Sequence, residues 1–288
     1  MNVTLLSSTD YPDCNYNYGD CILIDTNSEL IVYDCGCKEH AKRVHMYMCD
    51  HNYGKVKFVL SHNDSDHFNG LDYLIDNGLV SEVYTHLLFK YAEEIVLLLD
   101  DGRRNKESVI NSIKNSFDNI ASLSERTTLK DIFTETHVAD GITIAGPDKD
   151  YALKAVAKEI DNRFGDTIDN ETIRNAISTQ LSISFTPYKK LLLTGDSSFE
   201  AIKENLLTHS AIQLPHHGRP EQAKQIFEAT DVSTIFFVSD NTGNSNGGSD
   251  DLPTRGHAIF NTKIGDQTCT IATFYKTAPK SSYLRIYK

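Results

Sequence analysis

Short runs of apolar, β-branched residues alternate along the chain with longer segments whose apolar positions recur at helical spacing. Residues 21–25 and 29–36 are strand-like and flank a short polar turn, which predicts a β-hairpin. Residues 38–54 have helical periodicity and end on a glycine, so we expect a helix there. Residues 56–62 form a continuous apolar run, typical of a strand that is buried on both faces of a sheet.

The second half of the chain repeats this alternation. Residues 178–196 contain two strand-like runs around a turn, and helical periodicity follows at 197–209 and 222–230. Further strand-like runs lie at 210–218, 233–240, 268–275 and 281–288. Because both halves alternate strands and helices, we expect a single α/β domain over residues 1–288, built as a four-layer αββα sandwich of two sheets with helices outside.

One segment departs from the pattern. Residues 89–130 have helical periodicity, few strand formers and many charges, which predicts a helical insertion within the domain. Such an insertion suits a lid over a site or a surface for a protein partner.

Composition and charge limit which molecules the protein can be expected to bind. The chain has 288 residues and a formal net charge of -12, which argues against broad, non-specific binding to duplex nucleic acid. An anionic substrate in one pocket remains compatible with that charge, because a bound metal ion is itself a strong local positive charge.

The cysteine usage and the N-terminal sequence bear on the compartment. The six cysteines allow a disulfide interpretation, but the first residues show neither a basic region nor the apolar stretch of a secretory signal. We therefore expect free thiols in a cytoplasmic protein. No apolar run is long enough to span a bilayer.

The densest candidate chemistry lies in the run His62-Asn63-Asp64-Ser65-Asp66-His67, directly after the apolar strand. Imidazole nitrogens and carboxylate oxygens suit zinc, manganese or iron. In a loop at a strand end, alternate residues turn toward one point and the Asp-His pair toward another, which suits two neighbouring metal ions. The alternative is an ordinary polar surface loop, but loops rarely contain so many histidines and aspartates.

Two later strands also end in possible ligands. Asp196 closes the run Leu191–Asp196 and could bridge two metal ions, although a carboxylate in that place is often a helix N-cap. His216 and His217 follow another apolar strand. One of them can complete a metal site while its neighbour contacts the substrate or carries a proton.

Weaker candidates remain. His257 could be a ligand or contact an oxyanion, or it could be an exposed loop histidine. Arg219 and Arg255 are candidates for phosphate binding, or are solvated charges. His86 and His137 each end a strand-like segment and could supply a third ligand to the first metal. The other histidines outside the motifs lie in helical contexts and indicate surface positions: His40, His45, His51 and His209.

Together these motifs resemble those of metallo-β-lactamase-fold hydrolases. The residues Tyr18–Ile24 and Val32–Gly36 resemble the family's opening strands, and Ser61–His67 resembles its metal-binding signature. The commoner signature has histidine where Asp64 stands. That aspartate, followed in order by the runs ending in Asp196 and His217-Gly218, resembles the soluble hydrolase domain of the ComEC DNA-uptake proteins.

This resemblance implies a hydrolase with two divalent metal ions, zinc or manganese, and a bridging hydroxide as the nucleophile. Asp66 would orient that hydroxide, and His216 or His257 would protonate the leaving group. The implied ligands are His62, Asp64, Asp66, His67, Asp196 and one of the His216-His217 pair, with His217 placed as the ligand and His216 as the catalytic residue.

Three functions remain open at this point. The first is a phosphodiesterase or nuclease acting on DNA or a nucleotide, which the ComEC-like motif order favours. The second is a hydrolase of a small non-nucleotide ester, lactone or thioester, which the net negative charge favours. The third is an interaction or sensor module on a metallohydrolase scaffold, which the helical insertion favours.

Overall fold

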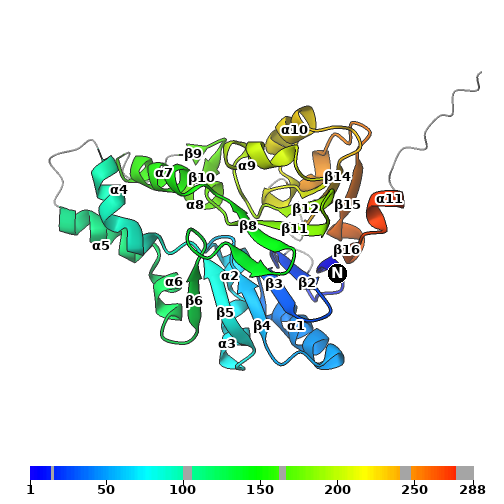
Figure 1. Ribbon diagram of the computed structural model, residues 1–288, viewed down its shortest axis with the longest axis horizontal. Coiled ribbons are helices and arrows are strands. Elements are labelled where there is room, and N and C mark those ends of the chain that lie inside the picture. The colour runs from blue at the N-terminus through cyan, green and yellow to red at the C-terminus, as the bar shows by residue number, and fades with distance from the viewer. Residues whose placement is uncertain (14–15, 100–105, 162–166, 241–247, 277–288) are drawn as a thin grey trace, which may run out of the picture.

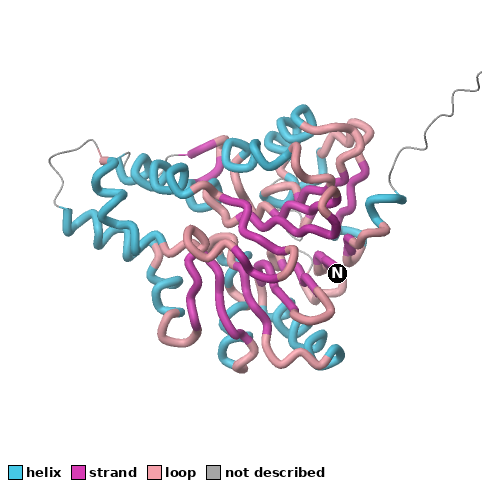
Figure 2. Tube along the Cα trace, in the orientation of Figure 1, coloured by secondary structure: helices cyan, strands magenta, loops and turns pink. Residues whose placement is uncertain are grey.

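Two large β-sheets lie face to face between outer helices in the computed structural model (Figure 1). The structure describes residues 1–13, 16–99, 106–161, 167–240 and 248–276. Helices, sheets and connecting loops are distinguished in Figure 2. The predicted four-layer αββα sandwich is confirmed.

The first sheet has the strand order β16-β1-β2-β3-β4-β5-β6. Neighbouring strands from β3 to β6 run parallel, and the pairs β1–β2, β2–β3 and β1–β16 are antiparallel. The strands span Asn2–Leu5 (β1), Cys21–Asp25 (β2), Leu30–Cys35 (β3), Val56–Val59 (β4), Val80–Thr85 (β5), Thr128–Asp131 (β6) and Gln267–Cys269 (β16).

The second sheet has the order β15-β14-β13-β12-β11-β8-β7, and its strands from β12 to β15 run parallel. The strands span His137–Ala139 (β7), Ile142–Gly146 (β8), Gln180–Thr186 (β11), Lys189–Leu193 (β12), Ala211–Gln213 (β13), Ile235–Val238 (β14) and Ala258–Asn261 (β15). A separate two-stranded ribbon is formed by Thr167–Ile168 (β9) and Glu171–Thr172 (β10).

Helices cover the outer faces of both sheets. They span Lys38–His51 (α1), Ser65–Phe68 (α2), Leu71–Asp76 (α3), Ala92–Leu98 (α4), Lys106–Ser116 (α5), Asp118–Leu123 (α6), Lys149–Asp161 (α7), Ile173–Ala176 (α8), Phe199–Leu206 (α9), Pro220–Ala229 (α10) and Thr273–Lys276 (α11). Short 3₁₀ turns occur at Leu88–Tyr91, His216–Gly218, Ser249–Asp251 and Thr262–Ile264. Among the described helices, none is long and apolar enough to cross a membrane.

The central strands are apolar on both faces, and the alternation of side chains explains why. Tyr33 of β3 points into the core between the two sheets, and its neighbour Val32 points into the core under α1. Leu193 of β12 likewise faces the first sheet, whereas Leu192 packs under α9 and α10. Successive side chains of a strand point to opposite faces. A strand between two apolar layers therefore needs an unbroken apolar run.

Two predicted element boundaries were wrong. The helical insertion 89–130 contains α4, α5 and α6, but its last residues belong to β6, which pairs with β5. The strand predicted at 268–275 ends at Cys269, and α11 follows it. The strand predicted at 281–288 lies outside the described residues.

The buried state of His40 also corrects a prediction. This side chain has no exposed surface, and His209 is only 7% exposed, so neither is a surface residue. His40 Nε2 donates a hydrogen bond to the Gly19 carbonyl (3.2 Å) and Nδ1 accepts one from the Tyr11 hydroxyl (2.9 Å). Burial lowers the pKa of His40 to about 4, so the ring is held neutral. The five cysteines in the described part of the chain are free thiols.

We predict that His40 makes the protein less stable at acid pH. The unfolded chain protonates this imidazole below about pH 6.5, whereas the folded chain does so only near pH 4, so stability is full above pH 6.5 and falls as the pH drops. Between pH 7.5 and 5 the wild type should lose about 2 kcal/mol more than His40→Gln in urea unfolding. An equal loss in both proteins would show that His40 is not buried neutral.

Candidate metal centre

The residues of the predicted site meet where the parallel strands of both sheets end. Asp34 lies near the end of β3, the run beginning at His62 follows β4, Asp196 follows β12 and His217 follows β13. In each sheet the carboxyl ends of parallel strands lie along one edge, as in other α/β proteins whose ligands bind there. Contacts between residues that follow β4 and β12 show that these two edges face one another.

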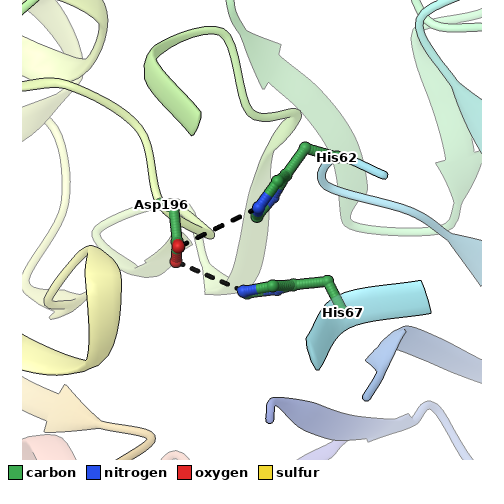
Figure 3. A group of neighbouring side chains, drawn as sticks. All are labelled: His62, His67 and Asp196. Atoms are coloured by element: carbon green, nitrogen blue, oxygen red, sulfur yellow. Dashed lines mark ion pairs between the residues drawn. The ribbon is translucent and has the colours of Figure 1, made fainter. Parts of the chain in front are cut away.

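Three side chains converge on one point at this edge. In Figure 3 the imidazoles of His62 and His67 both point at the carboxylate of Asp196. His62 Nε2 lies 3.9 Å from Asp196 Oδ2, and His67 Nε2 lies 3.4 Å from Asp196 Oδ1. All three residues are buried, and one ligand atom from each lies within 4.8 Å of the others. This spacing leaves room for one cation among them.

A second group adjoins the first. Asp66, His67 and His217 also bring three ligand atoms within 4.8 Å of one another. Asp66 Oδ2 lies 3.3 Å from His217 Nε2. Because His67 belongs to both groups, the structure offers two neighbouring places for a cation, on either side of one imidazole.

Hydrogen bonds behind the rings of His67 and His217 fix their orientation. His67 Nδ1 donates to Asp34 Oδ2 at 2.8 Å. His217 Nδ1 donates to the Ser239 carbonyl at 2.8 Å and lies 3.0 Å from Asp20 Oδ1. A hydrogen bond at one ring nitrogen sets the tautomer and presents the other nitrogen as a ligand. Each ring therefore presents Nε2 to the cluster.

The ring of His62 is held in the same way by hydroxyl groups. Its Nδ1 lies 2.9 Å from Ser61 Oγ and 3.1 Å from Ser178 Oγ. Burial lowers the pKa of His62 to about 3, so the ring is neutral and keeps a free lone pair. A neutral imidazole is the form that binds a metal ion.

The facing atoms have no hydrogen-bond partner among the described residues. His62 Nε2, His67 Nε2 and Asp196 Oδ1 are all buried and make no hydrogen bond to a described residue. More than nine in ten buried polar groups are hydrogen-bonded in folded proteins, so three buried atoms that face one another without a hydrogen bond need an explanation. Two imidazole nitrogens and a carboxylate oxygen fit a divalent cation, which would satisfy all three at once.

The charges of the cluster also favour a bound divalent cation. Burial alone would raise the pKa of Asp196, but the protonated ring of His67 holds that pKa well below its usual range, and the carboxyl groups around His67 raise the pKa of that ring in turn. A bound cation would take the place of that ring proton. Asp66 behaves alike, because His67 and His217 outweigh the effect of its burial and lower its pKa. Asp34 adds a further carboxyl group behind His67. The cluster therefore places ionised carboxylates side by side, which a cation would stabilise.

The backbone is strained where it presents the histidine pair. His216 and His217 have φ values of 49° and 55°, in the left-handed region that non-glycine residues rarely adopt. Each such residue costs about 1–3 kcal/mol, and this strain is typical of functional sites. Gly195, with φ 53°, makes the other sharp turn, and a Cβ there would lie 2.7 Å from Ser61 Cβ. That turn therefore requires glycine.

The structure separates the two neighbouring histidines. His217 faces the cluster, whereas His216 Nδ1 donates to Glu171 Oε2 at 2.5 Å. Glu171 is buried and also accepts from Arg219 Nη1 (2.9 Å) and Gln222 Nε2 (2.6 Å). The side chain of His216 keeps 22% of its surface exposed, so its ring can reach a bound molecule. The assignment of His217, rather than His216, as a metal ligand stays a prediction, and His217 is the one of the two that lies in the cluster.

Three further candidates lie outside the two groups. Asp64 Oδ2 is 3.8 Å from His62 Nε2, but the side chain is 38% exposed. His86 follows β5 at the same edge and is buried, yet it belongs to neither group. His137 begins β7 at the margin of the second sheet and is exposed. Asp64 could therefore extend the group that contains His62.

The assignment of His257 as a catalytic residue was wrong. His257 directly precedes β15, which runs parallel to β14, so it lies at the opposite end of the strands from Asp196. Its ring stacks on Phe227 of α10, with 5.0 Å between centroids. Arg255 of the same loop pairs with Glu228 and is equally remote.

Sequence motifs gave little indication of several residues that contact the cluster. Asp20 and Asp34 belong to the Gly-Asp and Asp-x-Gly runs of the opening strands, so those runs could have indicated their part behind the histidines. Asn17 donates to Asp66 Oδ2 at 2.8 Å, and Glu171 supports His216 from a two-residue strand. No motif marks either of these two.

Comparison with known proteins agrees with the architecture. The chain matches no protein-family model. A diphosphatase of the PhnP family superposes with a TM-score of 0.50 and 13% identity, over 94% of this chain and 98% of that one. The chain has the metallo-β-lactamase fold. At this identity, the likeness shows the fold alone.

Two other comparisons are more distant or shorter. Zinc-bound PqqB from Methylobacterium extorquens gives a TM-score of 0.48 with 11% identity, covering 94% of this chain and all of that one. The uncharacterized protein MJ0448 of Methanocaldococcus jannaschii is 31% identical over 101 residues. That match covers 34% of this chain and 40% of the relative, less than half of its length.

We predict that Glu171 is important for the stability of the site. Glu171→Gln replaces a buried carboxylate that accepts from an imidazole and a guanidinium, and breaking a buried ion pair costs about 3–5 kcal/mol. Urea unfolding should show a loss of that order. The matched change Glu221→Gln removes an exposed partner of Arg219 and should cost under about 1 kcal/mol. Equal effects would contradict the buried network.

Proposed function

We propose that the protein is a metal-dependent hydrolase with two adjacent divalent-cation sites. One observation carries the proposal. Buried imidazole nitrogens of His62 and His67 face a buried carboxylate oxygen of Asp196 without any hydrogen bond among the described residues. Such a group is costly to bury empty and is the ligand set that zinc or manganese prefers.

The two groups of side chains assign the ligands. His62, His67 and Asp196 would hold one ion, with Asp64 beside them. Asp66, His67 and His217 would hold the other. Aspartate in place of a third histidine supplies oxygen ligands, which favours manganese or another ion that accepts them as well as zinc.

The residues of this chain supply positioning and proton transfer. When bound, the metal ions lower the pKa of water and neutralise charge that develops on a phosphoryl or acyl oxygen. Asp66 has 22% of its side chain exposed and one oxygen held by Asn17, so its carboxylate can orient a water molecule. His216, fixed at Nδ1 by Glu171, can donate a proton from Nε2 to a leaving group.

A phosphodiester is the substrate class that we propose. Its anionic oxygens would be neutralised by two cations, and the order of the motifs ending in Asp196 and His217 resembles that of the ComEC-like hydrolase domain. The similar PhnP-family protein is a diphosphatase. DNA and nucleotides are the natural substrates of this class.

A second candidate is a hydrolase of a small ester, lactone or thioester. Arg219, a candidate for phosphate binding, donates to Glu171 and to the Asn170 carbonyl instead. Arg255 lies at the other end of the sheet. With a net charge of -12 and neither arginine at the cluster, a small substrate with little negative charge would also suit the site.

The test compares three substrates in the presence of manganese or zinc. We expect hydrolysis of bis-p-nitrophenyl phosphate to exceed that of a lactone and a thioester, and to stop with chelator. His67→Ala removes the imidazole shared by both groups, so activity should fall by more than the roughly 10–100-fold that loss of a supporting residue costs.

The exposed histidine of β7 provides the matched control, and His137→Ala should retain full activity. A protein that hydrolyses the lactone or thioester faster would favour the second candidate. If a folded, metal-supplied protein hydrolyses none of the three, or if His67→Ala remains fully active, the proposed function is wrong.

A further inference from the structure

The helical insertion contacts the loop that carries the predicted ligands. Asn63, which lies between His62 and Asp64, donates from Nδ2 to Asn119 Oδ1 at 2.9 Å. Asn119 returns a second hydrogen bond, from its Nδ2 to the Asn63 carbonyl at 3.4 Å. Asn119 is the second residue of α6, so this reciprocal amide pair joins the insertion to the loop.

The insertion packs closely against the rest of the domain around Asn119. Ile120 and Leu123 of α6 are almost fully buried in the core under the first sheet. Phe117 precedes α6, is 4% exposed and packs edge-on against His86, with 6.1 Å between ring centroids. The backbone amide of Ile120 also donates to Asn119 Oδ1 at 3.0 Å, which fixes that side chain. Asn119 is therefore a rigid point against which Asn63 can be held.

Hydrogen bonds also hold the loop on the N-terminal side of His62. The Ser61 amide donates to Asp34 Oδ1 at 2.7 Å, and the Ser61 carbonyl accepts from the Thr179 amide at 2.8 Å. Residues of the two sheets thus hold the loop before His62. After His62 the loop is held from the insertion by Asn119, and further along by Asn17, which donates to Asp66 Oδ2 at 2.8 Å.

The orientation of two predicted ligands depends on this second attachment. A residue's side chain follows the direction of its backbone, so His62 is aimed by the fixed positions of Ser61 and Asn63 on either side. Asp64 follows Asn63 directly and is the N-cap residue of α2. Without the hydrogen bonds to Asn119, the backbone at Asn63 gains freedom to turn the Asp64 carboxylate away from its 3.8 Å approach to His62 Nε2.

We propose that Asn119 is a positioning residue of the metal centre, and that the insertion is a structural part of the site through the Asn63–Asn119 amide pair. The inference rests on the proposed metal site for its effect on metal binding. Its effect on the loop is independent of any metal. Two readouts therefore separate a failure of this inference from a failure of the proposed function.

The first readout is hydrogen exchange of the backbone amides in the loop. Asn119→Ala in the full-length protein should speed exchange over residues 61–67 by about tenfold or more without added metal, while amides of α1 keep their rate. This follows because an opening of the loop no longer has to break the amide pair. Asp118→Ala changes the exposed residue next to Asn119 and should leave both segments unchanged.

The second readout is zinc affinity, measured by competition with a chromogenic chelator. Residues that orient metal ligands typically contribute 10–100-fold to affinity. Asn119→Ala should therefore weaken zinc binding by about tenfold or more, and Asp118→Ala should not. A purely structural loss would lower the melting temperature without a selective change in the loop or in zinc binding.

The variant Asn119→Asp covers the case in which Asn119→Ala fails to fold. It keeps an acceptor for Asn63 Nδ2 and removes the donor to the Asn63 carbonyl, so we expect a smaller rise in loop exchange. Unchanged exchange over residues 61–67 in a folded Asn119 variant overturns the inference. If the wild type binds no zinc, the proposed function fails, and the exchange result alone decides the role of Asn119.

Discussion

The carboxyl groups of Asp34, Asp66 and Asp196 surround the imidazole of His67, and all of these side chains except that of Asp66 are almost fully buried. Burying charged groups together is among the most costly arrangements in a protein unless each finds a partner. In this chain the partners are imidazoles, and the Nε2 atoms of His62 and His67 still make no hydrogen bond among the described residues. The requirement for positive charge at this one position governs how the surrounding structure is built.

The fold meets this requirement by bringing strand ends from two sheets together. Each sheet supplies part of the cluster from the carboxyl ends of its parallel strands, and the core between the sheets fixes their spacing. Local strain completes the arrangement, because the left-handed backbone at His216 and His217 sends one ring inward and the other toward Glu171. The favourable packing of the two sheets offsets the energetic cost of that turn, as is common at functional sites.

The sequence allowed the four-layer fold and the core of the site to be predicted, because both depend on local signals. His62, Asp66 and His67 lie within six residues after an apolar strand, so the composition of this one loop identifies them as candidate ligands. Asp196 and His217 could be added because each follows a strand of the same kind. The misplacement of His257 has the same origin, since a polar loop gives no sign of which end of a strand it borders.

Contacts between distant segments could not be predicted. Glu171 supports His216 across 45 positions, and Asn119 reaches Asn63 across 56, and neither pair leaves a pattern in the sequence. Such partners are chosen by the packing of whole elements, here a short ribbon and the helical insertion. The burial of His40 could not be predicted for the same reason. Its partners Gly19 and Tyr11 lie in a loop that folds over α1.

The location of bound ions tests the central claim most directly. Crystals grown with manganese or zinc can be measured at the absorption edge of the metal, so that anomalous scattering identifies each ion. Two neighbouring peaks are predicted, one among His62, His67 and Asp196 and one among Asp66, His67 and His217. A well-ordered crystal with no anomalous peak in this cluster, or with metal bound only elsewhere on the chain, would contradict it.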